Sequence, residues 1–285
     1  MELFHHFSLR VASESAAREF SDIGIELERG PQHTYGSSVA SIDIGERDER
    51  WMAVREIAEK YKITEFVTTK FSEEEINAAD ALCIFSKSQQ GYPEPSRELG
   101  FLAASYDLST YCAKCGTGLR QINPLRINFK PNLKRSIMQL NWIFDEYFVA
   151  RDVWAAVFEP LGIACWPVVL DRTGEEIESV VQLKISHYAD LILDEASATV
   201  CPTCGRTKTR MNVRGFCPMP TSIPAPIFKS TQYFGSDASA FNRVLVSSSL
   251  YKGIKKGRLR GVVFYPCGPS LNAVSAPSLS SETAA

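Results

Sequence analysis

The chain has 285 residues, of which 45% are apolar and 22% are charged. This is an ordinary globular composition, which excludes disorder over the whole chain, and the length allows one large domain or two modest ones. The net charge of −2 hides an uneven distribution, because residues 1–110 hold 20 acidic and 11 basic residues, and residues 111–285 hold 13 and 20. These charges of −9 and +7 indicate an acidic and a basic surface, each able to steer a partner of opposite sign, or two solvated surfaces that partly attract each other.

The sequence also restricts the compartment. No apolar run approaches the roughly 18 residues that a membrane-spanning helix requires. The first residues, MELFHHFSLR, lack the apolar core of a signal peptide. We therefore expect a cytoplasmic protein with no membrane partner. Eight cysteines are too few for a disulfide scaffold of this length, and in a reducing compartment paired cysteines favour metal binding.

The first third of the chain is predicted to be a mixed α/β region. Apolar side chains at helical spacing predict a helix over residues 46–61. Ser72 with Glu75 three positions later is a capping-box pattern, which predicts a short helix directly after Ser72. Residues 81–85 are typical of a buried strand, and the turn-rich segment 91–95 indicates a linker and a domain boundary.

The second part of the chain contains an internal similarity. Residues 144–168 and residues 241–267 each show a strand, a helix and a second strand that ends in an aromatic residue followed by proline. A Cys-x-x-Cys-Gly motif precedes each segment. A duplicated strand–helix–strand unit explains this pattern, although any unit of this kind shares the same outline.

Together these patterns predict an α+β protein with mixed sheets and a zinc-binding pair of Cys-x-x-Cys-Gly knuckles. The expected organisation has three parts: an acidic α/β region over residues 1–103, a zinc-binding domain over residues 104–269, and a disordered tail over residues 270–285. The tail is rich in small and polar residues and cannot form a core.

The two Cys-x-x-Cys-Gly motifs are the strongest signal, and they comprise Cys112, Cys115 and Gly116, and Cys201, Cys204 and Gly205. Two residues between cysteines allow both thiolates to bind one ion from a tight turn, and the glycine permits a positive φ. The two knuckles predict a closed Cys₄ site for Zn²⁺, which stabilises the fold and leaves no open position for catalysis. The long separation of the motifs requires the fold to bring them together. The alternatives are a redox dithiol in each pair or unrelated thiols.

The remaining cysteines and the histidines are weaker candidates. Cys83 and Cys165 lie in apolar runs and are expected in the core. Cys217, twelve or so residues after the second knuckle, is a substitute ligand in an alternative arrangement. The adjacent pair His5 and His6 could bind metal, but a core or surface role is the better interpretation. His33 and His187 are isolated, and Cys267 is the remaining cysteine.

No catalytic motif is recognisable, so we expect that the protein is not an enzyme. The sequence lacks a phosphate-binding glycine loop, a nucleophile elbow and a paired-histidine metalloprotease motif. Two pairs of adjacent carboxylates, at residues 145–146 and 194–195, are expected to point apart at a solvated edge. A basic run could contact phosphate or complement a helix dipole, and it comprises Lys252, Lys255, Lys256, Arg258 and Arg260.

Two widely spaced Cys-x-x-Cys-Gly motifs resemble the double-CXXCG motif family, a paralogous group best known from myxobacteria. The carboxyl end, with Phe234-Gly235-Ser236 and the later segments 243–247 and 261–264, is also similar to the ending of that group. The resemblance covers approximately residues 104–269. It implies a zinc ion bound by the cysteines of the two motifs: Cys112, Cys115, Cys201 and Cys204. Some members are taken to be immunity proteins of the contact-dependent Sit toxin exchange system.

Two functions therefore compete at this stage. The first is a bacterial immunity protein that neutralises a cognate toxin by stoichiometric protein–protein interaction, in the manner of a toxin–antitoxin pair. The acidic first part would suit a basic toxin such as a nuclease, and the acidic segments 46–59 and 73–75 are the expected surface. The second is a regulatory zinc protein that binds nucleic acid through the basic run, with Tyr233 and Tyr251 as exposed aromatics. An enzyme with a site assembled from distant residues is a third interpretation.

Overall fold

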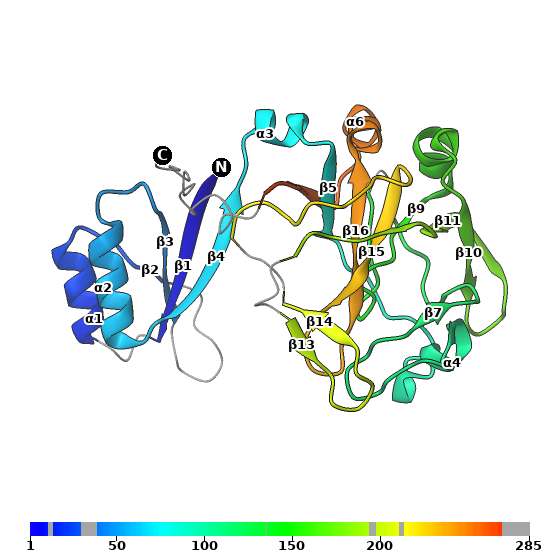
Figure 1. Cartoon of the computed structure of the whole chain (residues 1–285), viewed down its shortest axis with the longest axis horizontal. Coiled ribbons are helices and arrows are strands. Elements are labelled where there is room, and N and C mark those ends of the chain that lie inside the picture. The colour runs from blue at the N-terminus through cyan, green and yellow to red at the C-terminus, as the bar shows by residue number, and fades with distance from the viewer. Residues whose placement is uncertain (11–13, 30–38, 135, 194–197, 211–213, 270–285) are drawn as a thin grey trace, which may run out of the picture. The chain divides into compact units, whose positions relative to one another are not determined.

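The computed structural model describes residues 1–10, 14–29, 39–134, 136–193, 198–210 and 214–269 (Figure 1). These residues form helices and mixed sheets, which confirms the predicted α+β class. They group into two units, of which unit 1 comprises Met1–Glu75 with Asn212–Gly215, and unit 2 comprises Ile76–Met211 with Phe216–Ala285. The division lies earlier in the chain than the predicted limit at residue 103. The predicted tail, 270–285, lies outside the described residues.

Unit 1 has the element order of a split β-α-β sandwich. Its elements are β1 (Glu2–Arg10), α1 (Glu14–Asp22), β2 (Glu28–Arg29), β3 (Val39–Gly45), α2 (Trp51–Tyr61) and β4 (Thr64–Lys70). The strands pair in the antiparallel order β2-β3-β1-β4, which is the ferredoxin-like arrangement. Alternate residues of β1 and β3, among them Phe7 and Ile42, face α1 and α2, so both helices cover one face of the sheet (Figure 1).

The structure contains both helices that the sequence predicted in this region, α2 and α3 (Glu73–Ala78). The helix predicted over residues 46–61 begins only at Trp51, because Asp48 forms a turn in which its carboxylate accepts from the backbone N–H of Arg50 at 2.9 Å. The capping box is confirmed at α3. The backbone N–H of Ser72 donates to Glu75 at 2.8 Å, and that of Glu75 donates to the Ser72 hydroxyl at 3.2 Å.

Unit 2 contains a large sheet in the order β13-β14-β15-β16-β5-β17, with β12 paired to β15. Its strands are β5 (Ala81–Ser86), β12 (Tyr188–Ala189), β13 (Ala198–Val200), β14 (Thr207–Thr209), β15 (Ile227–Phe234), β16 (Phe241–Ser247) and β17 (Val262–Pro266). The predicted strand at residues 81–85 is confirmed as β5, with Leu82 and Ile84 in one core and Ala81 and Cys83 in another. Burial on both faces explains its continuous apolar run.

A smaller sheet of unit 2 has the order β8-β10-β11-β9. It comprises β8 (Arg126–Ile127), β9 (Phe148–Ala150), β10 (Cys165–Leu170) and β11 (Glu176–Leu183), and β6 (Tyr106–Asp107) pairs separately with β7 (Arg120–Gln121). The helical segments are η1 (Arg97–Leu99), α4 (Phe101–Ser105), α5 (Arg151–Val153), η2 (Trp154–Phe158), η3 (Glu159–Leu161) and α6 (Ser248–Lys256). Side chains of both sheets, η2 and α6 share one core, which holds the two sheets together.

The two segments of the predicted duplication have the same outline. In the first, β9 and β10 flank the antiparallel strand β11, and α5 to η3 connect them. In the second, β16 and β17 flank β5, and α6 connects them. Unit 1 repeats this split arrangement with β1, β3 and β2. Because three segments share the outline, the outline alone does not establish a duplication, and the duplication stays a prediction.

The predicted linker at residues 91–95 is not a boundary. Gly91 has a φ of +61°, and a Cβ atom there would lie 2.1 Å from the ring of Phe129. The backbone N–H of Glu94 donates to the carbonyl of Arg126 at 2.8 Å. This segment therefore belongs to unit 2, and its glycine permits the close approach of Phe129. No helix in the described part of the chain is long and apolar enough to cross a membrane.

Candidate functional site

The fold of unit 2 brings the two Cys-x-x-Cys-Gly motifs together. The Sγ atoms of Cys112 and Cys201 are 4.0 Å apart, and those of Cys115 and Cys204 are 3.6 Å apart. All four Sγ atoms lie within 4.8 Å of one another. A tetrahedral thiolate site with metal–sulfur distances of about 2.3 Å has sulfur–sulfur distances of about 3.8 Å. The separations therefore match a single metal ion bound by the four predicted cysteines.

The two knuckles have the same backbone structure. In the first, the N–H of Cys112 donates to the carbonyl of Thr117 at 2.9 Å, and the N–H of Gly116 donates to the carbonyl of Cys112 at 2.7 Å. The corresponding bonds of Cys201 and Gly205 in the second knuckle are both 2.9 Å. Gly116 and Gly205 have φ values of +80° and +71°, which only glycine adopts without strain. The motif therefore specifies the turn as well as the ligands.

Thr117 and Arg206 connect the two knuckles, and sequence reasoning missed both. The Thr117 hydroxyl lies 3.1 Å from Sγ of Cys115 and 3.9 Å from Sγ of Cys204. The Arg206 guanidinium donates to the carbonyl of Thr110 at 2.7 Å and to the Thr117 hydroxyl at 3.4 Å. Each residue directly follows the glycine of its motif. That position was the only sequence signal that could have identified them.

The surroundings of three of the four sulfurs, those of Cys115, Cys201 and Cys204, favour thiolates. The N–H of Cys115 lowers the pKa of Cys112, but burial and the neighbouring thiols outweigh it, and the net pKa of Cys112 is raised. Backbone N–H groups of Cys204 and Thr203 lower the pKa of Cys201, and the N–H of Arg206 lowers the pKa of Cys204. Burial raises the pKa of Cys115, but the hydroxyl and N–H of Thr117 outweigh burial, and its net pKa is lowered. Thiolates are the form that binds metal. Four cysteine sulfurs around one ion would form a closed site, which is suited to stabilising a fold and not to activating water.

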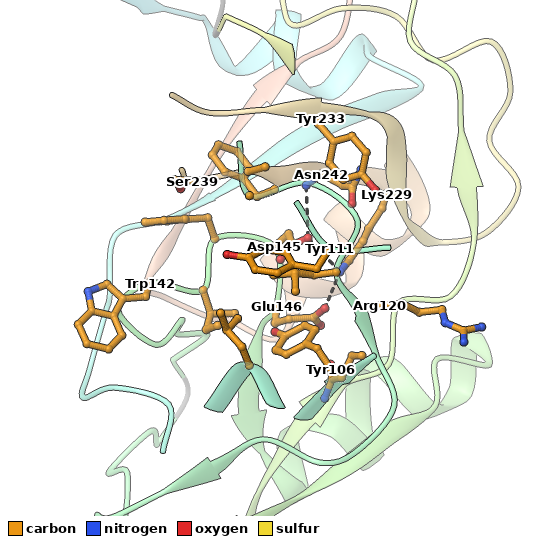
Figure 2. Close-up of a pocket in the computed structure, with 18 of the residues that line it drawn as sticks. Tyr106, Tyr111, Arg120, Trp142, Asp145, Glu146, Lys229, Tyr233, Ser239 and Asn242 are labelled. Carbon is orange, nitrogen blue, oxygen red and sulfur yellow. Dashed lines mark hydrogen bonds and ion pairs between the residues drawn. The ribbon is translucent and has the colours of Figure 1, made fainter. Parts of the chain in front are cut away.

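A cavity of about 620 Å³ lies between the sheets of unit 2 (Figure 2). Ligand pockets usually measure about 300–1,000 Å³. Gly116 and Tyr111 belong to its wall, so the first knuckle contributes directly to the cavity. Aromatic side chains form much of the remaining wall: Trp142, Phe144, Trp166, Tyr233 and Phe241.

Three charged side chains meet at the floor of this cavity. The Nζ atom of Lys229 on β15 donates to Asp145 at 3.2 Å and to Glu146 at 2.5 Å, as the dashed lines of Figure 2 show. The side chains of Lys229 and Glu146 are only 6% and 7% exposed. Gln182 donates to the second oxygen of Glu146 at 2.9 Å and is itself paired with Gln121. The cluster is therefore part of the interior of unit 2.

This cluster corrects the prediction that Asp145 and Glu146 point apart at a solvated edge. Both reach the same ammonium group, because residues 144–147 form an irregular segment before β9 and not an extended strand. Burial raises the pKa of Glu146. Burial lowers the pKa of Lys229, but the neighbouring Asp145 and Glu146 outweigh burial, and its net pKa is raised. Lys229 therefore stays charged. The second predicted carboxylate pair, 194–195, lies outside the described residues.

The three histidines in the described part of the chain are not part of either site. His5 is buried between the carboxylates of Glu46 and Glu65, and His6 pairs with Asp43 at 3.0 Å, so both contribute to unit 1. His187 contributes its backbone carbonyl to the N–H of Lys229 at 2.9 Å, and His33 lies outside the described residues.

The remaining cysteines lie apart from the cluster of four cysteines. Cys83 is in the core as predicted, whereas Cys165 is only half-buried. Cys217 is not a substitute ligand, because it packs beside Cys83 and Cys267 in a separate apolar cluster.

The predicted basic run lies at the end of α6 and in the loop after it. All five of its Lys and Arg side chains are exposed. Tyr251 is buried against Phe264, with ring centroids 5.0 Å apart, and is therefore not the exposed aromatic that was predicted. Tyr233 is half-buried at the cavity wall.

Comparison with known proteins adds no further assignment: no protein-family model, curated protein or solved structure matches this chain.

Proposed function

We propose that this chain is a zinc-stabilised binding protein of the double-CXXCG type, which neutralises a cognate toxin by stoichiometric binding and performs no catalysis. The observation that carries this proposal is the convergence of Cys112, Cys115, Cys201 and Cys204 on one closed site. A closed thiolate site supplies folding energy and has no position for a substrate. The free thiols of the chain suit action in the reducing cytoplasm.

The charge of the chain supports a basic partner such as a nuclease toxin. Residues 1–110 carry a charge of −9, and opposite charges raise association rates. The predicted surface needs refinement, because Glu46, Asp48 and Glu75 are held in contacts within unit 1. Exposed carboxylates remain at Glu49 and Glu74, with Glu56 on α2. These are the groups available to steer a partner.

Co-expression tests the proposal. A toxin from the same cells should stop growth alone, and growth should recover when this protein is produced in at least equal amount. Titration of purified toxin should show that inhibition ends at a fixed molar ratio. Rescue that persists with the protein far below the concentration of the toxin would indicate turnover and would contradict a stoichiometric mechanism.

A second candidate, a nucleic-acid-binding zinc protein, has one specific observation in its favour. The basic side chains between Lys252 and Arg260 are all exposed, as phosphate contacts require. Affinity for DNA or RNA would then fall steeply with salt, and a Lys255→Gln, Lys256→Gln, Arg258→Gln variant would bind all sequences more weakly. An absence of binding at low salt would eliminate this candidate. The burial of Tyr251 already removes one of its two predicted base-stacking residues.

A further inference from the structure

One carboxylate oxygen of Asp145, which lines the cavity of unit 2, has no hydrogen-bond donor among the described residues. Oδ2 of Asp145 accepts from Lys229 at 3.2 Å and from the backbone N–H of Asn242 at 3.3 Å (Figure 2). Among the described residues, no donor approaches Oδ1 of Asp145. Among the described residues, every fully buried side-chain oxygen has a hydrogen-bond partner, so an oxygen without one is not fully buried. The Asp145 side chain is 20% exposed, and it lines the cavity. Oδ1 is therefore open to a molecule that enters the cavity.

The floor of the cavity also carries an excess of negative charge. Asp145 and Glu146 supply two carboxylates, and Lys229 supplies one ammonium group. Uncompensated charge is costly inside a protein, and a bound cation would remove that cost.

Two other cations line the cavity, but both are exposed. Arg120 is paired with Asp107 at 2.7 Å, and Lys184 lies over the ring of Trp166, with Nζ 4.5 Å from the centroid. Their charges are screened by water and salt, whereas the charges of the floor are not. The interior of the cavity therefore favours a cation over an anion.

The walls of the cavity are suited to the uncharged part of a cationic ligand. Phe144 and Phe241 pack together with ring centroids 5.5 Å apart, and Tyr111, Tyr233 and Ile143 also line the cavity. Aromatic faces attract ammonium groups, and apolar walls bind a hydrophobic body.

We propose that this cavity binds a small protonated organic amine, whose N–H donates to Oδ1 of Asp145 and whose apolar or aromatic part packs against the walls. The site is separate from the metal ligands and from the acidic surface of unit 1. The proposal therefore goes beyond toxin binding, and it holds or fails independently of it.

Isothermal titration calorimetry of the full metal-loaded chain tests this proposal with three matched sets of probes. Each set has one body and three end groups: 2-phenylethylamine, 2-phenylethanol and 3-phenylpropionate, with benzyl and indolyl-ethyl sets as smaller and larger bodies. Because a charge-assisted hydrogen bond discriminates strongly, the best-fitting amine should bind at least about tenfold more tightly than its alcohol and its carboxylate. If no amine binds at millimolar concentration, or an alcohol or carboxylate binds equally well, the proposal is wrong.

Variants locate the binding site. Asp145→Asn keeps the shape of the side chain and leaves the Lys229–Glu146 pair in place, and it should reduce the preference for the amine to less than about threefold. Asp171→Asn is the matched control, because Asp171 has a similar exposure of 23% and also pairs with a cation, Arg126, but does not line the cavity. This control should retain the full preference. A preference that survives in Asp145→Asn would overturn the assignment.

A second variant covers the case in which Asp145→Asn does not fold. Phe144 is 39% exposed, so Phe144→Leu should preserve the fold. Because it removes an aromatic face and keeps an apolar wall, amine binding should weaken about threefold or more and alcohol binding should change little. Equal loss for both probes would show that the cavity has no preference for a cation.

Discussion

In the proposed metal centre, each of the four sulfur ligands depends on the other three. Cys204→Ser would leave three buried cysteine sulfurs around an incomplete site. Since metal affinity at such a site is folding energy, we expect the melting temperature to fall by about 10 °C or more, or the variant to be insoluble. Differential scanning calorimetry measures this change, and metal analysis should show one zinc per wild-type chain and none in the variant.

The same experiment contains its control. Cys165→Ser changes a half-buried thiol outside the metal centre and should keep both the zinc and the melting temperature within a few degrees. A Cys204→Ser protein that melts like the wild type would mean that the two motifs are not a structural metal site.

Lys229 provides a second prediction for a single side chain. Replacing it by methionine leaves Glu146 buried without its cation, and breaking a buried ion pair from one side costs about 3–5 kcal/mol. The double variant Lys229→Met, Glu146→Gln removes both charges of that pair and should recover a substantial part of the loss. Urea unfolding of both variants measures the difference. Equal stability of the single and double variants would show that Lys229 and Glu146 are not energetically coupled.

The turns of the two knuckles differ in what surrounds their glycines. Both have positive φ, but a Cβ atom on Gly116 would lie 2.2 Å from the carbonyl oxygen of Ala238, whereas nothing lies within 4 Å of one on Gly205. Gly205→Ala should therefore cost about 1–2 kcal/mol, the strain of a left-handed residue. Gly116→Ala should cost clearly more, because the loop that contains Ala238 must move as well.

Chemical denaturation of the two alanine variants measures both costs with one method. Because Gly116 and Ala238 both line the cavity, Gly116→Ala should in addition weaken any cavity ligand, and Gly205→Ala should not. An equal cost for the two glycines would mean that the close approach of the Ala238 loop contributes nothing to stability.

Across the whole molecule, the uneven charge predicts how a partner associates. The triple variant Glu49→Lys, Glu56→Lys, Glu74→Lys reverses exposed carboxylates of unit 1. It should lower the association rate with a basic partner about tenfold or more and reduce its dependence on salt, because steering acts through long-range charge. Stopped-flow measurement of association at several ionic strengths tests this prediction. Rates that are unaffected would exclude this surface.

A matched control reverses three exposed carboxylates of unit 2: Asp80, Glu159 and Glu178. The net charge changes equally, so an effect confined to the first variant assigns the steering to the acidic surface of unit 1. Both variants should unfold at nearly the wild-type temperature, since exposed substitutions rarely change stability by more than about 0.5 kcal/mol.

The cluster of four cysteines was predictable because its pattern is local in the sequence. Each pair of ligands and its glycine stand within five consecutive residues, and the same short pattern occurs twice. The strand at residues 81–85 and the capping box at Ser72 were predictable for the same reason. The start of α2 was not, since the turn at Asp48 has its own side-chain hydrogen bonds that compete with the helix.

The charged floor of the cavity was not predictable from local patterns. Lys229 is separated from Glu146 by 83 positions and from Asp145 by 84. It lies on β15 between the apolar Phe228 and the polar Ser230. The carboxylates belong to a different segment, which leads into the smaller sheet. These residues become neighbours only because the two sheets pack together. Neither segment has a local sequence pattern that indicates this contact.

The separation of the two knuckles has a consequence for how the protein is made. Cys112 and Cys201 stand 89 positions apart, and much of the cavity wall, with both carboxylates of its floor, belongs to the chain between them. During synthesis, Cys112 and Cys115 leave the ribosome before Cys201 and Cys204. The four-cysteine cluster can therefore form only after Cys204 has been synthesised. The proposed metal would then close a long loop, and we expect the wall that includes Tyr111 and Gly116 to take its final position at that step. The zinc available during translation would therefore determine the fraction of molecules that fold with an intact cavity.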